Sequence, residues 1–216
     1  MNALKPRPFR PVLWLSGLLA ILCFSSVAAE DSDVIVHVEE DWEIVMATPD
    51  ADWSTPQFGI VMSPAGLAGD YMVFEMNHST SPSPVDGGLQ IQRWSGDHVV
   101  EWDNCPQSEK LHHADEKITF TTNMTVAECG LTFEVSNGHS ESWGEFGDHG
   151  HLKLVAPSYL SNLNGYSPDF SASESRVDYG SNRVQTLKLV EVRYYDSEGL
   201  VSTDETDRVV HDNPDQ

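Results

Sequence analysis

Apolar and polar residues alternate in short runs along most of the chain beyond residue 33. The clearest run sets the apolar residues Ile118, Phe120, Met124 and Val126 against Thr119, Thr121, Asn123 and Thr125. Other apolar rows start at Val34, Trp42, Phe58, Met72, Leu89, Val100, Leu131 and Leu152. Because successive side chains of a strand point to opposite sides, these rows predict strands that each bury one face.

Turn-forming residues separate the runs, and the clearest are Ser95-Gly96-Asp97, Cys129-Gly130, Asn137-Gly138 and Asn164-Gly165. No long segment has the apolar period of a helix, and the candidates for a single helical turn are Gln107–Lys117 and Pro157–Leu163. About ten short strands with regular turns predict an all-β fold. We expect a two-sheet antiparallel sandwich and favour a jelly roll.

The last strand region contains a slip in its alternation. Leu187 and Leu189 share one face, whereas Val190, Val192 and Tyr194 share the other. A β-bulge between Leu189 and Val190 would restore a single buried face. The alternative is a central strand that is buried on both faces.

Residues 1–29 have the three parts of a secretory signal peptide. Positive Lys5, Arg7 and Arg10 precede the apolar run Val12–Phe24, and the small Val27 and Ala29 predict cleavage after Ala29. The run is shorter than the roughly 20 residues that a spanning helix needs, although an uncleaved anchor is the alternative. No later segment is apolar enough to be transmembrane, so we expect a secreted, periplasmic or cell-surface protein.

The chain after the signal peptide is short enough to form one core, and it shows no internal repeat and no long linker. We assign residues 30–201 to a single β-sandwich domain. The polar, acidic residues 202–216 are predicted to form a flexible tail.

The formal net charge of −22 is strongly acidic. Such a charge repels phosphate backbones, so we expect no nucleic acid among the partners. It suits either a salty medium, in which ions screen the self-repulsion, or the binding of cations. No cofactor is certain; calcium is the favoured candidate because it binds carboxylates and loop carbonyls, and Thr48–Trp53 is one candidate loop.

Cys105 and Cys129 are the cysteines that remain after the signal peptide. In an exported protein, such a pair predicts one structural disulfide. Closing a loop of this length would contribute roughly 3 to 3.5 kcal/mol. Neither cysteine has neighbours that would make it a catalytic thiol.

A resemblance is carried by short segments, namely Trp42–Val45, Phe74–His78, Gly87–Gln92, Leu131–Gly138, Trp143–Gly147, Leu163–Tyr166, Asn182–Val184 and Val192–Tyr195. With these segments the chain resembles a family of exported proteins from planctomycete-type bacteria, over nearly all of its length after residue 29. The resemblance implies a concanavalin A-like sandwich, which is a fold shared by lectins and by several glycan-cleaving enzymes. It implies no catalytic residue.

Glycan cleavage on such a fold needs two carboxylates that face each other across a cleft. The sequence lacks the Glu-x-Asp-x-x-Glu pattern that enzymes of this fold often show, and we interpret Glu39, Glu40 and Asp41 as solvated residues of a hairpin turn. It also lacks the nucleophile elbow of serine hydrolases and a phosphate-binding glycine loop. Asp148, His149 and His151 are the candidate ligands of a transition metal.

Aromatic rings can bind sugars, because the C–H face of a sugar stacks on a ring. Trp94, Trp143 and Tyr166 fall near turns or in loops and are the candidate ligand-binding residues. Trp42 and Trp102 are in phase with apolar strand positions, so we predict that both lie in the core.

The first functional hypothesis is a non-catalytic exported module that binds polysaccharide or presents a surface at the cell envelope. The second is a structural or interaction protein of the envelope that depends on divalent cations. The third is a divergent glycan hydrolase or lyase.

Overall fold

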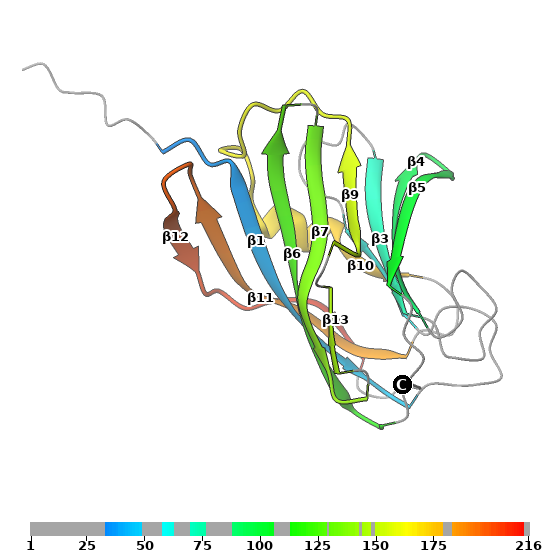
Figure 1. Ribbon diagram of the computed structural model, residues 1–216. Coiled ribbons are helices and arrows are strands. Elements are labelled where there is room, and N and C mark those ends of the chain that lie inside the picture. The colour runs from blue at the N-terminus through cyan, green and yellow to red at the C-terminus, as the bar shows by residue number, and fades with distance from the viewer. Residues whose placement is uncertain are drawn as a thin grey trace, which may run out of the picture. The chain divides into compact units, whose positions relative to one another are not determined.

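A computed structural model describes residues 33–48, 58–62, 70–76, 88–105, 113–128, 130–142, 144–147, 150–178 and 183–213 (Figure 1). The elements in these ranges are β1 (His37–Met46), β2 (Phe58–Met62), β3 (Asp70–Met76), β4 (Leu89–Ser95), β5 (His98–Cys105), β6 (Glu116–Ala127), β7 (Gly130–Ser140), β8 (Gly144–Phe146), β9 (Lys153–Ala156), α1 (Pro168–Glu174), β10 (Arg176–Asp178), β11 (Val184–Tyr195), β12 (Leu200–Asp204) and β13 (Arg208–Asp212). The predicted signal peptide and its cleavage site lie outside these residues.

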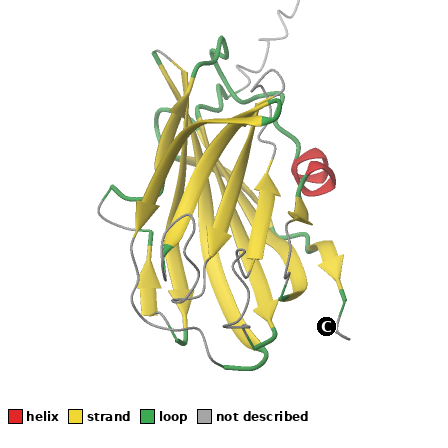
Figure 2. Cartoon of the chain, turned by 90° about the vertical axis from the view of Figure 1, so that its right-hand side faces the viewer, coloured by secondary structure: helices red, strands yellow, loops and turns green. Residues whose placement is uncertain are grey.

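The strands form two antiparallel sheets that lie face to face as two layers (Figure 2). The eight-stranded sheet has the order β12-β11-β1-β6-β7-β8, with β13 beside β11 and β9 beside β7. The five-stranded sheet has the order β10-β2-β3-β4-β5. This arrangement confirms the predicted all-β, two-sheet antiparallel sandwich.

Aromatic side chains from both sheets meet in the core. The ring of Phe74 on β3 lies 5.1 Å from that of Phe120 on β6 and 5.4 Å from that of Phe58 on β2. Trp42 is also buried, as predicted. Removing one such buried ring typically costs about 3 to 5 kcal/mol, so these contacts hold the two sheets together.

The slip in the last strand region is a β-bulge, which confirms the first of the two alternatives. Asp41 of β1 pairs with Glu191 and Trp42 pairs with Leu189, so Val190 is the extra residue. As a result, Leu187, Leu189 and Val192 all lie in the core. The bulge also turns Glu191 and Arg193 to the outer face of the sheet.

Two predicted turns are wrong. Glu39, Glu40 and Asp41 lie in the middle of β1, where the apolar rows on either side form one continuous strand. Asn137-Gly138 lies within β7, at a second bulge opposite Phe120. Asn137 has φ +51°, a left-handed conformation that asparagine tolerates better than most residues, so a turn-type sequence here makes a bulge.

The predicted tail from residue 202 contains strand structure instead. β12 and β13 pair one after the other along the same edge of β11, with residues 205–207 between them. The sandwich therefore extends at least to Asp212. Polar composition misled the prediction because an edge strand needs few buried side chains.

The helix also differs from the sequence prediction. α1 begins after Ser167, whose side chain accepts a hydrogen bond from the N–H of Phe170, and Pro168 occupies its first turn. Ser-Pro is a helix-start signal that the apolar period of so short a helix could not reveal. No helix in the described part of the chain has the length and apolarity to cross a membrane.

The predicted disulfide is not present, because Cys105 carries a free thiol; Cys129 itself lies outside the described residues. The backbone N–H of Gly147 donates a hydrogen bond to Cys105, and Gly147 packs against Val135 in the middle of β7.

Candidate functional site

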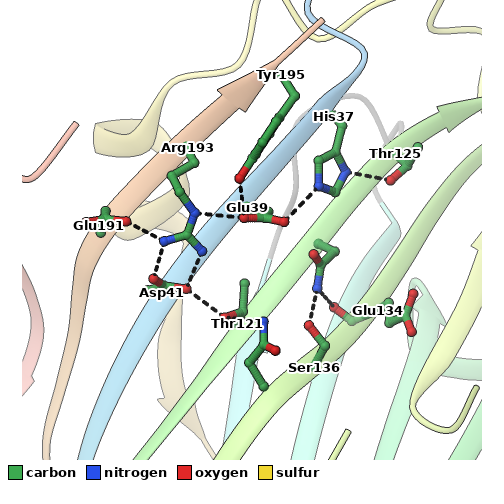
Figure 3. Close-up of polar contacts among 12 residues, drawn as sticks. His37, Glu39, Asp41, Thr121, Thr125, Glu134, Ser136, Glu191, Arg193 and Tyr195 are labelled. Carbon is green, nitrogen blue, oxygen red and sulfur yellow. Dashed lines mark hydrogen bonds and ion pairs between the residues drawn. The ribbon is translucent and has the colours of Figure 1, made fainter. Parts of the chain in front are cut away.

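A layer of polar side chains lies on the outer face of the eight-stranded sheet, and Figure 3 shows contacts within part of it. We call this layer the polar face, and its members are Glu191, Arg193 and Tyr195 on β11, His37, Glu39, Asp41 and Glu43 on β1, Lys117, Thr119, Thr121, Asn123 and Thr125 on β6, Glu134, Ser136 and Asn137 on β7, and Lys153 on β9. They project together because alternate strand residues point to one side and paired residues share a face.

Arg193 is the centre of this layer. Its Nη1 and Nη2 donate to the two carboxylate oxygens of Asp41 at 2.6 and 3.0 Å, and its Nε donates to Glu39 at 2.7 Å. Nη1 also contacts the carboxylate of Glu191. The hydrogen bonds to Asp41, followed by those to Glu39 and Glu191, raise the pKa of Arg193 despite its partial burial. The guanidinium is therefore a fixed cation in a rigid frame.

Glu39 links Arg193 to the aromatic end of the face. The hydroxyl of Tyr195 donates to Glu39 at 2.7 Å, and His37 Nε2 lies 3.2 Å from its other oxygen. Burial alone would raise the pKa of Glu39, but the hydrogen bonds from Arg193, Tyr195 and His37 outweigh it and lower the pKa. Glu39 is therefore an ionised acceptor and is unsuited to act as a general acid.

A hollow of about 440 Å³ opens beside Arg193 on the polar face. Its polar walls come from Asp41, Glu43, Lys117, Thr119, Thr121, Asn137 and Arg193. The two bulged positions, Val190 and Asn137, line it from opposite strands. Bulges interrupt the regular packing of side chains on a sheet, which accounts for a depression at this place.

The polar walls of the hollow are held by their own contacts. Thr121 donates a hydrogen bond of 2.6 Å to Asp41, and the amide of Asn137 reaches Thr121 at 3.4 Å. Lys117 lies 2.5 Å from Glu43. Each carboxylate around the hollow thus has a cationic partner, so the hollow offers hydroxyl, amide and carboxylate oxygens but no unpaired acid.

The sequence-predicted ligand residues are not brought together. Tyr166 is only 9 % exposed, and its hydroxyl donates to the buried carboxylate of Glu40, so the prediction that its ring is available to a ligand is wrong. Trp94 lies on the other sheet, half-buried, with its ring stacked 6.0 Å from that of Tyr71. Trp143 lies outside the described residues.

Only one of the three predicted transition-metal ligands, His151, lies among the described residues. Asp148, His149 and most of the candidate calcium loop lie outside the described residues, and His151 is exposed. Within the part of the chain that is described, no three acidic, histidine or cysteine side chains are grouped so that they could hold a metal ion.

The sequence contains a signal for the polar face in the alternation of β1. Glu39, Asp41 and Glu43 occupy alternate positions between the buried residues Val38, Trp42 and Ile44. The same alternation that located the core therefore places the acids on the opposite face. Their partner Arg193 could be placed only once the bulge at Val190 was known.

Comparison with known proteins adds no relative: no protein-family model matches the chain, and neither the curated proteins nor the solved structures include a significant match.

Proposed function

We propose that this chain is an exported, non-catalytic protein that binds glycan through the hollow of its polar face. The observation that carries the proposal is the set of polar groups fixed around that hollow, with Asp41 held by Arg193 and Thr121 held by Asp41. Preorganised groups lose little entropy when a ligand binds.

The mixture of groups suits a ligand that is rich in hydroxyls. A sugar hydroxyl both donates and accepts hydrogen bonds, and the hollow offers donors at Lys117 and Asn137 beside acceptors at Asp41 and Glu43. Its volume of about 440 Å³ lies within the usual range of small-molecule sites, which suits one or a few sugar units.

The pairing of charges supports binding without catalysis. A glycosidase needs one carboxyl group with a raised pKa and a second one facing it across the sugar. Glu39 has a lowered pKa, and Asp41 and Glu43 are each tied to a cation. The finer expectations, namely a concanavalin A-like jelly roll, export by a signal peptide and membership of the planctomycete-type family, remain part of this proposal.

The test is a glycan array with and without calcium, followed by calorimetry on the best ligand. Thr119→Val removes a hydroxyl from the hollow, and Asn137→Gly removes an amide while tolerating the positive φ. Each should weaken binding about tenfold, which is about 1.4 kcal/mol. Thr132→Val, on the same sheet but outside the hollow, is the matched control. Absence of binding to any neutral or acidic glycan would refute the proposal.

A further inference from the structure

We propose that the outer face of the five-stranded sheet carries a second carbohydrate site, in which an aromatic strip binds the C–H faces of a neutral glycan chain. The aromatic strip consists of Tyr71 on β3, Trp94 on β4 and Trp102 on β5. This site is separate from the hollow and does not depend on it.

The three rings come from adjacent strands and share one face. Tyr71 pairs with Trp94, and their rings are nearly parallel at 10°. Trp102 pairs with Gln92, which is two residues before Trp94, so the two tryptophans are diagonal neighbours on the sheet. Diagonal neighbours on adjacent strands are close enough for large aromatic side chains to form one surface.

Trp102 is 63 % exposed, which corrects the prediction that it lies in the core. On the adjacent strand β4, Leu89 and Ile91 face the core, so Gln92 faces outward. Trp102 pairs with Gln92 and therefore also faces outward. An exposed tryptophan on an edge strand is costly to leave in water. A ligand that covers the ring would recover that cost.

Fixed amides lie next to the rings. Gln92 Oε1 accepts a hydrogen bond from the indole N–H of Trp94 at 2.8 Å, while its Nε2 donates to Gln90 at 2.5 Å and to Glu75 at 3.2 Å. This chain of contacts sets the orientation of Trp94. Gln92 is only 9 % exposed and Gln90 only 4 %, so these buried amides fix the position of the ring and leave contact with a ligand to the rings themselves.

Charge selects a neutral glycan. Glu75 is a buried carboxyl group on the same face of the sheet as the strip, and the whole chain carries a net charge of −22. A polyanion such as a uronic-acid or sulfated polymer would be repelled. A chain ligand is favoured over a single sugar because the rings are distributed over three neighbouring strands.

The two proposed sites lie on opposite sides of the molecule. Met72, Phe74 and Ile91 turn the inner face of the five-stranded sheet toward the core, so the strip faces away from the eight-stranded sheet. A substitution in one site should therefore leave the other site unchanged.

The test is calorimetry of the full-length mature protein with neutral hexasaccharides (cellohexaose, xylohexaose and mannohexaose), the matching disaccharides and polygalacturonate. We expect at least one hexasaccharide to bind more tightly than its disaccharide, and polygalacturonate not to bind. Trp102→Ala should weaken hexasaccharide binding about tenfold. Tyr159→Ala, which removes a fully exposed ring elsewhere, should leave binding unchanged.

Three results would overturn the proposal that the aromatic strip binds a neutral glycan. One is that no hexasaccharide binds or that Trp102→Ala binds as well as the wild type. The second is equal binding of polygalacturonate. The third is a change of oligomeric state in Trp102→Ala with glycan binding intact, which would make the strip a protein interface. The variant Thr119→Val, which changes only the hollow, should still bind hexasaccharide through the aromatic strip. The proposal for the hollow and the proposal for the strip can therefore fail independently.

Discussion

The hydroxyl of Tyr166 donates a 2.5 Å hydrogen bond to the carboxylate of Glu40, which lies 126 residues earlier in the chain. Glu40 is 2 % exposed and occupies a core position on β1 between Val38 and Trp42. Ser171 of α1 and Thr122 of β6 also donate to it, at 2.5 and 2.7 Å. A buried carboxylate surrounded by hydroxyl donors thus fastens the segment around α1 to the eight-stranded sheet.

Tyr166→Phe should destabilise the protein by about 1 to 3 kcal/mol, because Glu40 loses a charge-assisted hydrogen bond in a buried site. Urea unfolding monitored by circular dichroism measures this change. Tyr159→Phe is the control, since Tyr159 is fully exposed and should behave as the wild type. Equal stability of the two variants would show that the bond to Glu40 contributes nothing.

Glu75→Gln should make stability less dependent on pH. Burial raises the pKa of Glu75 from 4.5 to about 7. Between these values the folded protein holds a proton that the unfolded chain has lost, so wild-type stability falls as the pH rises and levels off above about 7. The variant should therefore match the wild type at pH 5 and exceed it at pH 8, by up to about 3 kcal/mol. Urea unfolding of the wild type and the variant at both pH values measures this effect. A stability difference between the two proteins that is the same at pH 5 and pH 8 would contradict the raised pKa of Glu75.

Arg193→Met should leave Glu39, Asp41 and Glu191 without their shared cation. We expect a loss of about 2 to 4 kcal/mol at neutral pH. The lowered pKa of Glu39 stabilises the wild type above the ordinary carboxyl range, and this contribution disappears as the pH falls through the lowered value. The stability gap between variant and wild type should therefore narrow in acid.

A carboxyl-carbon NMR titration gives the second measurement on Arg193→Met. The pKa of Glu39 should rise in the variant, because burial then acts against fewer opposing hydrogen bonds. Arg193→Lys is the matched control: it keeps the charge but cannot form the paired bonds to Asp41, so it should give an intermediate value.

Cys105→Ser should change the unfolding free energy by less than about 1 kcal/mol under non-reducing conditions. A variant that lost a structural disulfide would lose about 3 kcal/mol. Burial, followed by the charge of Asp103, raises the pKa of the Cys105 thiol, so it should react slowly with thiol reagents in the folded protein. A melting temperature that falls on reduction of the wild type but not of Cys105→Ser would contradict the free thiol.

The strand pattern could be predicted from the sequence because each apolar row reports a buried face directly. Even the bulge at Val190 was visible, since Leu187, Leu189 and Val192 cannot otherwise share one face. Exposure at the sheet edge was not visible. Trp102 continues an apolar row, but β5 is the last strand of its sheet, and strand order depends on contacts between segments far apart in the chain.

The polar chemistry was harder to predict for a related reason. Glu40 and Glu116 stand at core positions, and an acidic residue is normally assigned to the surface. Each is compensated by donors from distant segments, such as Tyr166 for Glu40 and the backbone N–H of Ser142 for Glu116. A single sequence does not reveal these pairings, because pairing is decided by the fold.

The interrupted edge formed by β12 and β13 has a consequence for how these molecules behave when they are crowded. A long bare strand edge is a template on which another chain can add and start a fibril. Here residues 205–207 interrupt the edge between β12 and β13. The side chain of Arg208, at the start of β13, forms ion pairs with Asp204 and Asp169. A foreign strand could add only a few hydrogen bonds on either side of the break, so this edge resists polymerisation.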